Sequence, residues 1–108
     1  MKTVLQNFSF GDKKISIYIP DILEIQSLHE QQLVENKNSH FPYWAKVWPS
    51  AIGLCEFLVK NNYFIKNKNI VELAAGLGLP SIVAAEYGSH IYCSDYLQEP
   101  LHFVQKSI

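Results

Sequence analysis

The sequence predicts an α/β fold organised around a βαβ unit, which is preceded by a β-hairpin and helices. Two short apolar runs, residues 70–74 and 90–94, alternate with helical patterns, as in parallel strands that are joined by a helix. Gly76 and Gly78 directly follow the first run, where such a strand would turn into its helix. The chain has 108 residues, which is enough for one small domain.

The composition excludes several classes of protein. Hydrophobic residues make up 48% of the chain and aromatic residues 13%, more than a disordered chain carries. The formal net charge of −1 gives no basic excess for nucleic acid, and no apolar run reaches the roughly 18 residues of a membrane span. The four histidines show no metal-ligand spacing, and the two cysteines lie inside apolar segments without a CxxC pair. Buried free thiols favour a reducing compartment, so we expect a cytoplasmic protein.

The N-terminal segment predicts a hairpin followed by a helix. Apolar and polar residues alternate on both sides of Gly11-Asp12, which is a turn signal. Asp21 is placed to cap a helix over residues 21–35, with Glu24 in the capping-box position. Residues 36–41 are polar, have no period and predict a loop. The alternating apolar residues are Val4, Phe8 and Phe10, then Ile15, Ile17 and Ile19.

A second helix is predicted between the tryptophans and the glycines. Ser50 can cap its N-terminus after Pro49, and the Asn61-Asn62 pair marks its end. Apolar residues recur inside it at helical spacing. These residues are Ala51, Leu54, Cys55, Leu58 and Val59. The run 70–74 that follows is short and apolar, which is typical of a strand buried on both faces.

A helix, a strand and a last helix complete the βαβ pattern. Pro80 suits the first turn of the helix after the glycines, and Gly88 suits its C-terminal end. The run 90–94 is the second strand. The last helix covers residues 97–108, and its first turn tolerates Pro100.

The glycine loop points to a ligand that contains a nucleoside. In a βαβ unit, ligands bind at the carboxyl ends of the strands, where glycine lets the backbone approach a ligand closely. Asp95 ends the second strand, 23 residues after Glu72, at a spacing where an acid accepts hydrogen bonds from ribose hydroxyls. We therefore expect the middle of the ligand at Gly76 and Gly78 and its sugar at Asp95.

The same loop disfavours a dinucleotide. The fingerprint G-x-G-x-x-G requires a third glycine where this chain has Ser81. Pro80 removes one of the N–H donors that a phosphate would use, and the loop holds no lysine or arginine. No Gly-Lys-Ser/Thr follows, so the loop is not a P-loop. These features favour a ligand of adenosine and a sulfonium group, which carries no phosphate.

The stretch ELAAGLG, residues 72–78, resembles the E/D-x-G-x-G-x-G motif of class I, seven-strand methyltransferases that use S-adenosylmethionine. Asp95, in CSDY, matches their acid at the end of the second strand. The segment FPYWAKVWPSAIGLCEFL resembles the W-x-x-x-W-P-[SG] segment of one branch, which includes the electron-transfer-flavoprotein β-subunit lysine methyltransferase and other protein-lysine methyltransferases. The resemblance covers residues 41–108. It implies a Rossmann-like S-adenosylmethionine-methyltransferase fold, of which this chain would hold the N-terminal part only.

Carried over to this chain, the motif implies a role for each loop residue. Ala74, Ala75 and Gly76 would form the loop under the methionine part of the cofactor. Gly78 would open the following helix. Glu72 would anchor the loop and face the amino group of the cofactor, directly or through water. Ala74 stands where the family has its first glycine, a change that costs little if its φ is negative.

Side chains outside the loop complete the implied pocket. Asp95 would hold the ribose hydroxyls, and Trp48 would wall the pocket with its π-face toward the sulfonium charge. Trp44 is a weaker candidate for the same wall. Ordinary structural roles stand beside these: tryptophans are more often core residues, and Asp95 can cap the last helix. Glu72 can be a satisfied structural acid, and Lys46 suits a solvated surface.

We expect residues 1–40 to form an extension and residues 41–108 to form the S-adenosylmethionine-binding half of a methyltransferase domain. A complete domain needs on the order of 200 residues, so the chain is expected to be truncated before its catalytic part, and no catalytic residue is assigned. The expected function is methyl transfer from S-adenosylmethionine to an acceptor. The tryptophan segment implies a protein lysine, and a small-molecule acceptor stays open beside it. The alternatives are a nicotinamide-dependent oxidoreductase fragment and a non-catalytic remnant that binds S-adenosylmethionine.

The expected partners follow from the same observations. A methyl acceptor is expected, and neither nucleic acid, a membrane nor a metal ion is. Two parallel strands alone leave an open apolar edge, so we also expect self-association through that edge.

Overall fold

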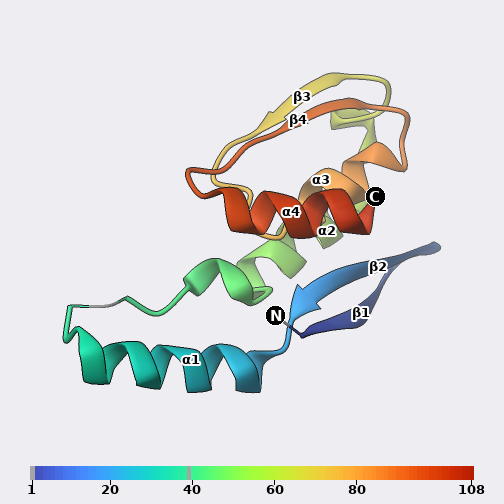
Figure 1. The fold of residues 1–108 in the computed structure, drawn as a ribbon. Helices are drawn as coiled ribbons and strands as arrows, with labels where there is room; N and C mark the ends of the chain where they lie inside the picture. The colour runs from blue at the N-terminus through green and yellow to red at the C-terminus, as the bar shows by residue number, and fades with distance from the viewer. Residues whose placement is uncertain (1, 39) are drawn as a thin grey trace.

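The computed structural model describes residues 2–38 and 40–108 and has the mixed α/β fold that the sequence predicts (Figure 1). The strands are β1 (Thr3–Phe10), β2 (Lys13–Pro20), β3 (Asn69–Glu72) and β4 (His90–Cys93). The α-helices are α1 (Ile22–Glu35), α2 (Pro49–Lys60), α3 (Leu79–Ala85) and α4 (Gln98–Ser107), and two 3-10 turns are η1 (Tyr43–Ala45) and η2 (Asn62–Phe64). Within the described ranges, no helix combines the length and the apolar character that crossing a membrane requires.

The N-terminal hairpin forms as predicted. β1 and β2 pair antiparallel from Thr3 opposite Pro20 to Phe10 opposite Lys13. Gly11, at φ +61°, makes the turn between them in the left-handed region that glycine adopts without strain. The alternation places the side chains of one face, including Phe10, Ile15 and Ile17, in the core.

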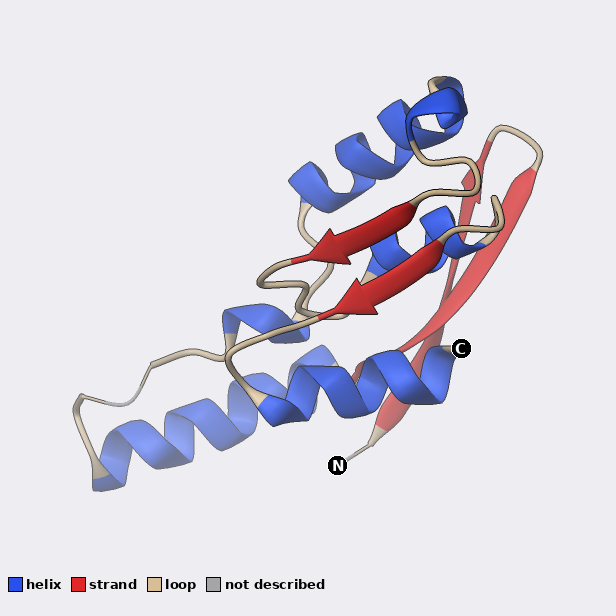
Figure 2. Ribbon diagram, turned by 90° about the horizontal axis from the view of Figure 1, so that it is seen from above, coloured by secondary structure: helices blue, strands red, loops and turns tan. Residues whose placement is uncertain are grey.

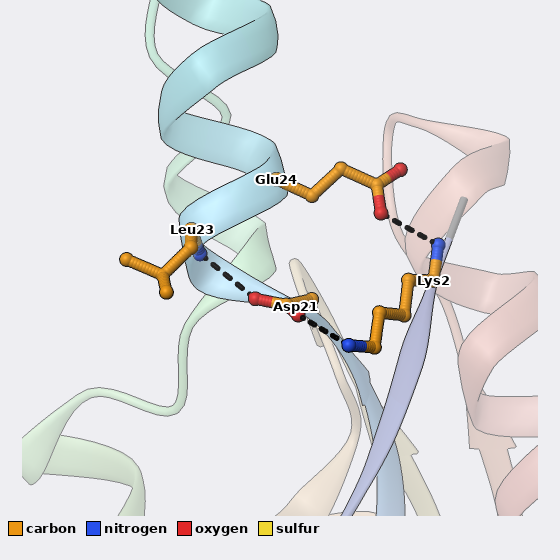
Figure 3. Close-up of polar contacts among 4 residues, drawn as sticks. All are labelled: Lys2, Asp21, Leu23 and Glu24. Atoms are coloured by element: carbon orange, nitrogen blue, oxygen red, sulfur yellow. Dashed lines mark hydrogen bonds and ion pairs between the residues drawn. The ribbon is translucent and has the colours of Figure 1, made fainter.

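The start of α1 is tied to the start of β1 by a small polar cluster (Figure 3). Asp21 caps the helix, because its Oδ1 accepts from the Leu23 N–H at 3.0 Å. The expected capping box does not form: Glu24 Oε2 accepts from the Lys2 N–H at 2.9 Å instead. The Asp21 N–H that a capping box would use donates to the Lys2 carbonyl, also at 3.0 Å. The Lys2 ammonium lies 3.6 Å from Asp21 Oδ2. The backbone and the side chain of Lys2 therefore both tie β1 to the start of α1.

Helix α1 contributes little to the core. Ile25 is its one buried residue, whereas Val34 is 87% exposed. In Figure 1 the helix lies at the bottom of the view, on the far side of the molecule from β3 and β4. Of the loop expected over residues 36–41, residue 39 lies outside the described residues, and the others carry no helix or strand.

Helix α2 begins two residues earlier than expected, and Trp48 rather than Ser50 is its N-cap. Pro49 is the first helical residue, where its fixed φ suits the helix and its missing N–H is not needed. The Trp48 carbonyl accepts from the Ala51 N–H at 3.0 Å, and no side chain caps the helix. The helix ends as predicted, with Asn61 as its C-cap.

Strands β3 and β4 form the expected parallel pair, in register from Asn69 opposite His90 to Glu72 opposite Cys93. The expectation that the first of them is buried on both faces is wrong. Val71 is 62% exposed and Tyr92 71% exposed, so one face of the pair meets solvent. Figure 1 shows why: α3 and α4 lie on one side of the two strands, and no described segment covers the other side.

The core lies where the hairpin meets α2, α3 and the glycine loop (Figure 2). Its buried residues come from all of these elements: Phe10, Ile15, Ile17, Cys55, Leu77, Leu79 and Val83. Helix α4 packs on β2, and Ser107 Oγ accepts from the Tyr18 N–H at 2.9 Å. Leu77 and Leu79 are buried at the point where the glycine loop runs into α3. They anchor this end of the loop to the core and so hold its backbone in place for a ligand.

Candidate functional site

A cavity of about 500 Å³ opens between the N-terminal end of α2 and the loops that follow β3 and β4. The structure brings all of the cofactor-binding residues predicted from the sequence to its lining, with Trp44 and Lys46. Those predicted residues are Trp48, Glu72, Ala74, Ala75, Gly76, Gly78 and Asp95. The carboxyl ends of two parallel strands meet here, which is where ligands bind in an open α/β sheet.

The loop after β3 takes a conformation that needs positive φ at three positions. Gly76 has φ +55° and Gly78 has φ +71°, both without strain because they lack Cβ. Ala74 has φ +51°, so the condition under which this alanine would cost little, a negative φ, is not met. Two backbone bonds fix the turn: the Ala75 N–H donates to the Ser94 carbonyl, and the Gly78 N–H donates to the Ala75 carbonyl, each at 2.9 Å.

Asp95 joins the two strand-end loops. Its Oδ2 accepts from the Gly76 N–H at 2.8 Å, and its Oδ1 accepts from the Leu97 N–H at 3.0 Å. Leu97, not Asp95, is the N-cap of α4. The Asp95 side chain instead closes a turn just before the helix, through its bond to the Leu97 N–H. A carboxylate offers about four lone pairs, so these two bonds leave room for two hydroxyl donors from a ligand.

Glu72 ends β3 and reaches the first turn of α3. Its Oε1 accepts from the Ser81 N–H at 3.1 Å and from the Ser81 hydroxyl. Burial raises the pKa of the Glu72 carboxyl, and the two bonds from Ser81 counter part of that rise. Glu72 is thus a satisfied structural acid that also lines the cavity.

The tryptophans have different environments. The Trp48 indole N–H donates to the Tyr43 carbonyl at 2.7 Å, and the Trp48 side chain is part of the cavity wall and 39% exposed. The Trp44 ring packs against Phe103, with 5.7 Å between their centroids, on the side of the core. The Lys46 ammonium lies 4.7 Å from the Trp48 ring centroid, so Lys46 is not only a solvated surface residue.

Sequence reasoning missed two residues that support the site. Ser81 was noted only as the residue that replaces a third glycine, although that position already placed it in the first turn of α3, within reach of a strand-end acid. Tyr43 fixes Trp48 through its backbone carbonyl, and no side-chain pattern signals a backbone acceptor. Both residues hold the side chains that face the cavity.

The lining chemistry limits what the cavity can hold. It is largely apolar, and its volume is in the range of small-molecule sites. Its ionisable acids are Glu72 and Asp95, and Lys46 is the single cation among its described lining residues. This set suits an uncharged or cationic ligand with a diol, and it offers no cluster of donors for phosphate.

Comparison with known proteins gives a family for most of the chain. The sequence model of the lysine methyltransferase family matches residues 29–108. The bovine (Bos taurus) protein-lysine methyltransferase METTL21E is 47% identical over 68 residues, which cover 61% of this chain and 23% of that protein. The mouse (Mus musculus) EEF1A lysine methyltransferase 3 is 33% identical over 67 residues, 62% of this chain and 29% of that protein.

The acceptor named for the relatives varies. The Xenopus laevis histone-arginine methyltransferase METTL23 is 28% identical over 89 residues, which cover 82% of this chain and 31% of that protein. The chain spans between 23% and 32% of the length of the METTL21E relatives from cattle and mouse. Residues 29–108, which the family model matches, contain the tryptophan segment, the glycine loop and Asp95.

Proposed function

Because this chain belongs to the lysine methyltransferase family, we propose that its cavity binds S-adenosylmethionine and serves methyl transfer to a protein lysine. The observation that carries the proposal is the Asp95 carboxylate. It lies two residues after β4, accepts from the Gly76 N–H of the glycine loop, and lines the cavity with acceptor capacity left over. An acid in this position is suited to the two hydroxyls of a ribose.

The residues around Asp95 fit the rest of the cofactor. The backbone at Gly76 can approach a ligand closely, because even an added Cβ there would have its nearest neighbour 3.9 Å away, at the Trp44 carbonyl oxygen. We assign the methionine part to the loop of Ala74, Ala75 and Gly76, and the aromatic wall to Trp48. When bound, S-adenosylmethionine supplies a methyl group on a positively charged sulfur. The chain's own residues bind it, orient it and shield it from water.

The lysine acceptor rests on the family and on the names of the relatives. A lysine must lose its proton before its nitrogen can accept a methyl group, so a complete site must supply a proton acceptor or a path to solvent. We assign that role to none of the described residues. The proposed contribution of this chain is therefore the cofactor half of the reaction.

We also propose a cytoplasmic location. Cys55 and Cys93 are both free thiols in the structure. Burial raises the pKa of Cys55 to about 12, so this thiol stays protonated and unreactive. Free thiols of this kind are typical of a reducing compartment.

Calorimetric titration of S-adenosylmethionine into the purified 108-residue chain tests the cofactor proposal. We expect saturable binding by the wild type, no binding of NAD, and loss of S-adenosylmethionine binding in Asp95→Ala. Asp95→Asn is the matched variant, because an amide oxygen can still accept from the Gly76 N–H while the negative charge is gone. Circular dichroism of each variant shows whether the loop change has unfolded the chain.

The outcomes separate the alternatives. A folded chain that binds NAD and not S-adenosylmethionine would replace the proposal by a nicotinamide-dependent function. A folded chain that binds neither ligand would show that these 108 residues do not form a cofactor site by themselves. Equal S-adenosylmethionine affinity of the wild type and Asp95→Ala would mean that the bound ligand does not contact Asp95.

A further inference from the structure

One cation faces the proposed cofactor cavity, and it is held by an aromatic ring. Lys46 is the basic residue in the lining, and its Nζ lies 4.7 Å from the centroid of Trp48. Within the described part of the chain, Lys46 forms no ion pair. The ring is therefore the interaction partner of this charge, through the negative electrostatic potential above its face.

The ring itself is fixed in place. The indole N–H of Trp48 donates to the Tyr43 carbonyl at 2.7 Å, and the Trp48 backbone is the N-cap of α2, directly before Pro49. The Tyr43 ring lies alongside, with 5.9 Å between the centroids. Trp48 thus cannot turn without losing a hydrogen bond, and because Trp48 and Lys46 both line the cavity, a ligand there meets the ring and the ammonium group together.

We propose that Lys46 makes the cavity selective for ligand charge, disfavouring the cationic cofactor S-adenosylmethionine relative to its neutral thioether product, S-adenosylhomocysteine. This inference rests on the proposed function. The two ligands differ by one methyl group and one positive charge at sulfur. A cation that enters the cavity meets a ring that already contacts the exposed Lys46 ammonium group, and like charges repel.

The other charges in the cavity act on the same ligand difference with the opposite sign. Glu72 and Asp95 favour the cationic ligand over the neutral one, but they are present in the wild type and in every variant at position 46. The effect of Lys46 is therefore isolated by the change in the ratio of the two dissociation constants.

The test is calorimetry of both ligands on the 108-residue chain, as wild type and as Lys46→Met, which removes the charge and keeps an unbranched apolar side chain. We expect Lys46→Met to tighten S-adenosylmethionine binding about fivefold and to change S-adenosylhomocysteine binding by less than about twofold. Lys46→Arg keeps the charge and should keep the wild-type ratio. Lys68→Met is the matched control, because Lys68 is exposed, lies just before β3 and is not in the lining.

Ionic strength gives a second readout. Added salt should reduce the change in the ratio of the two dissociation constants that Lys46→Met produces, because screening weakens the repulsion between Lys46 and the sulfonium charge. Equal changes for both ligands in Lys46→Met would overturn the inference, and so would a selective loss of S-adenosylmethionine affinity. If neither ligand binds in any variant, the proposed function fails, and this inference fails with it.

Discussion

Ala74 shows how a single residue can place backbone strain in the loop that lines the cavity. It is one of two non-glycine residues in the described chain with a positive φ, at +51°, and the other is Asn67. Asparagine tolerates the left-handed region better than alanine does, because its side chain can form local hydrogen bonds there. Alanine has no such compensation, so the loop stores strain directly beside the proposed cofactor.

Replacing Ala74 by glycine should therefore stabilise the chain. Relief of strain exceeds the added chain entropy of glycine, and we expect a net gain of about 0.5–1 kcal/mol in the free energy of unfolding. Urea denaturation measures this change. Ala85→Gly, at an exposed position in α3, is the control and should lose stability, because glycine disfavours a helix. Destabilisation by Ala74→Gly would show that the loop does not hold this conformation in solution.

Glu72 should make stability depend on pH in the direction opposite to an ordinary ion-paired acid. Burial raises its pKa in the folded state, so between the unfolded and the folded pKa the folded chain binds more protons. Its contribution to stability is then complete below the unfolded pKa and is lost as pH rises through the folded pKa. Glu72→Gln keeps an oxygen that can accept from Ser81 and removes the charge. The free energy of unfolding of this variant should therefore rise relative to that of the wild type as pH rises from about 4 to 7.

Urea denaturation at several pH values follows the difference between Glu72→Gln and wild type. Glu30→Gln removes an exposed negative charge on α1 and controls for net charge. A difference that does not change with pH would mean that Glu72 is solvated in the folded chain.

At this scale the sequence predicts positions better than conformations. The spacing of Gly76, Gly78 and Asp95 was sufficient to place them at one cavity, because parallel strands bring their carboxyl ends to one edge. The φ of Ala74 follows from the tertiary bonds of the loop, so residue type alone does not predict its sign. The bond from Ser81 to Glu72 likewise depends on how α3 is placed against β3.

Among the elements, Gly78 joins the glycine loop to two helices at once. It is the N-cap of α3, and a Cβ added to it would lie 2.8 Å from Cγ2 of Val104 in α4. The missing side chain therefore lets α4 approach the start of α3. Two independent requirements, a positive φ and close packing, meet at this one residue.

Gly78→Ala should lose about 2–3 kcal/mol in the free energy of unfolding, from the strained φ and the clash together. Val104→Ala makes room for the added methyl group, so the double variant should lose less than the sum of the single variants. Gly53→Ala is the matched control. Gly53 lies inside α2, and its added Cβ would meet nothing within 4 Å, so we expect a gain of about 0.5–1 kcal/mol. Strict additivity of Gly78→Ala and Val104→Ala in thermal or urea denaturation would contradict the contact.

The elements themselves were largely predictable, and the errors have physical causes. The hairpin and α2 followed from period and turn signals, which are local. The N-cap of α2 moved to Trp48, because Pro49 can occupy the first helical position without a side-chain cap. Val71 was expected to be buried because β3 is apolar, but burial depends on what covers the strand, and no local pattern contains that information.

For the molecule as a whole, the uncovered face of the β3–β4 pair decides whether copies of the chain associate. Val71, Leu73 and Tyr92 are 62%, 76% and 71% exposed. The pair has two strands, so each of them also has a free edge. Exposed apolar side chains next to unpaired strand edges favour association between copies.

We therefore expect the chain to self-associate as its concentration rises, which sedimentation velocity detects directly. The double variant Val71→Lys with Tyr92→Lys should shift the distribution toward monomer while the circular dichroism spectrum is retained, because charge on this face opposes pairing. Val34→Lys adds charge at an exposed position of α1 and should leave association unchanged. A wild-type chain that stays monomeric across the range would remove self-association as a property of this sheet.

The bond between Tyr18 and Ser107 has a consequence for how the chain folds. It joins residues 89 positions apart, and α4 packs on β2 at the same place. The hairpin can form locally within microseconds, but its docking waits for residues at the opposite end of the chain. During synthesis the first strands are therefore made long before their last neighbour, and their apolar face is open to chaperones and to misfolding until α4 emerges.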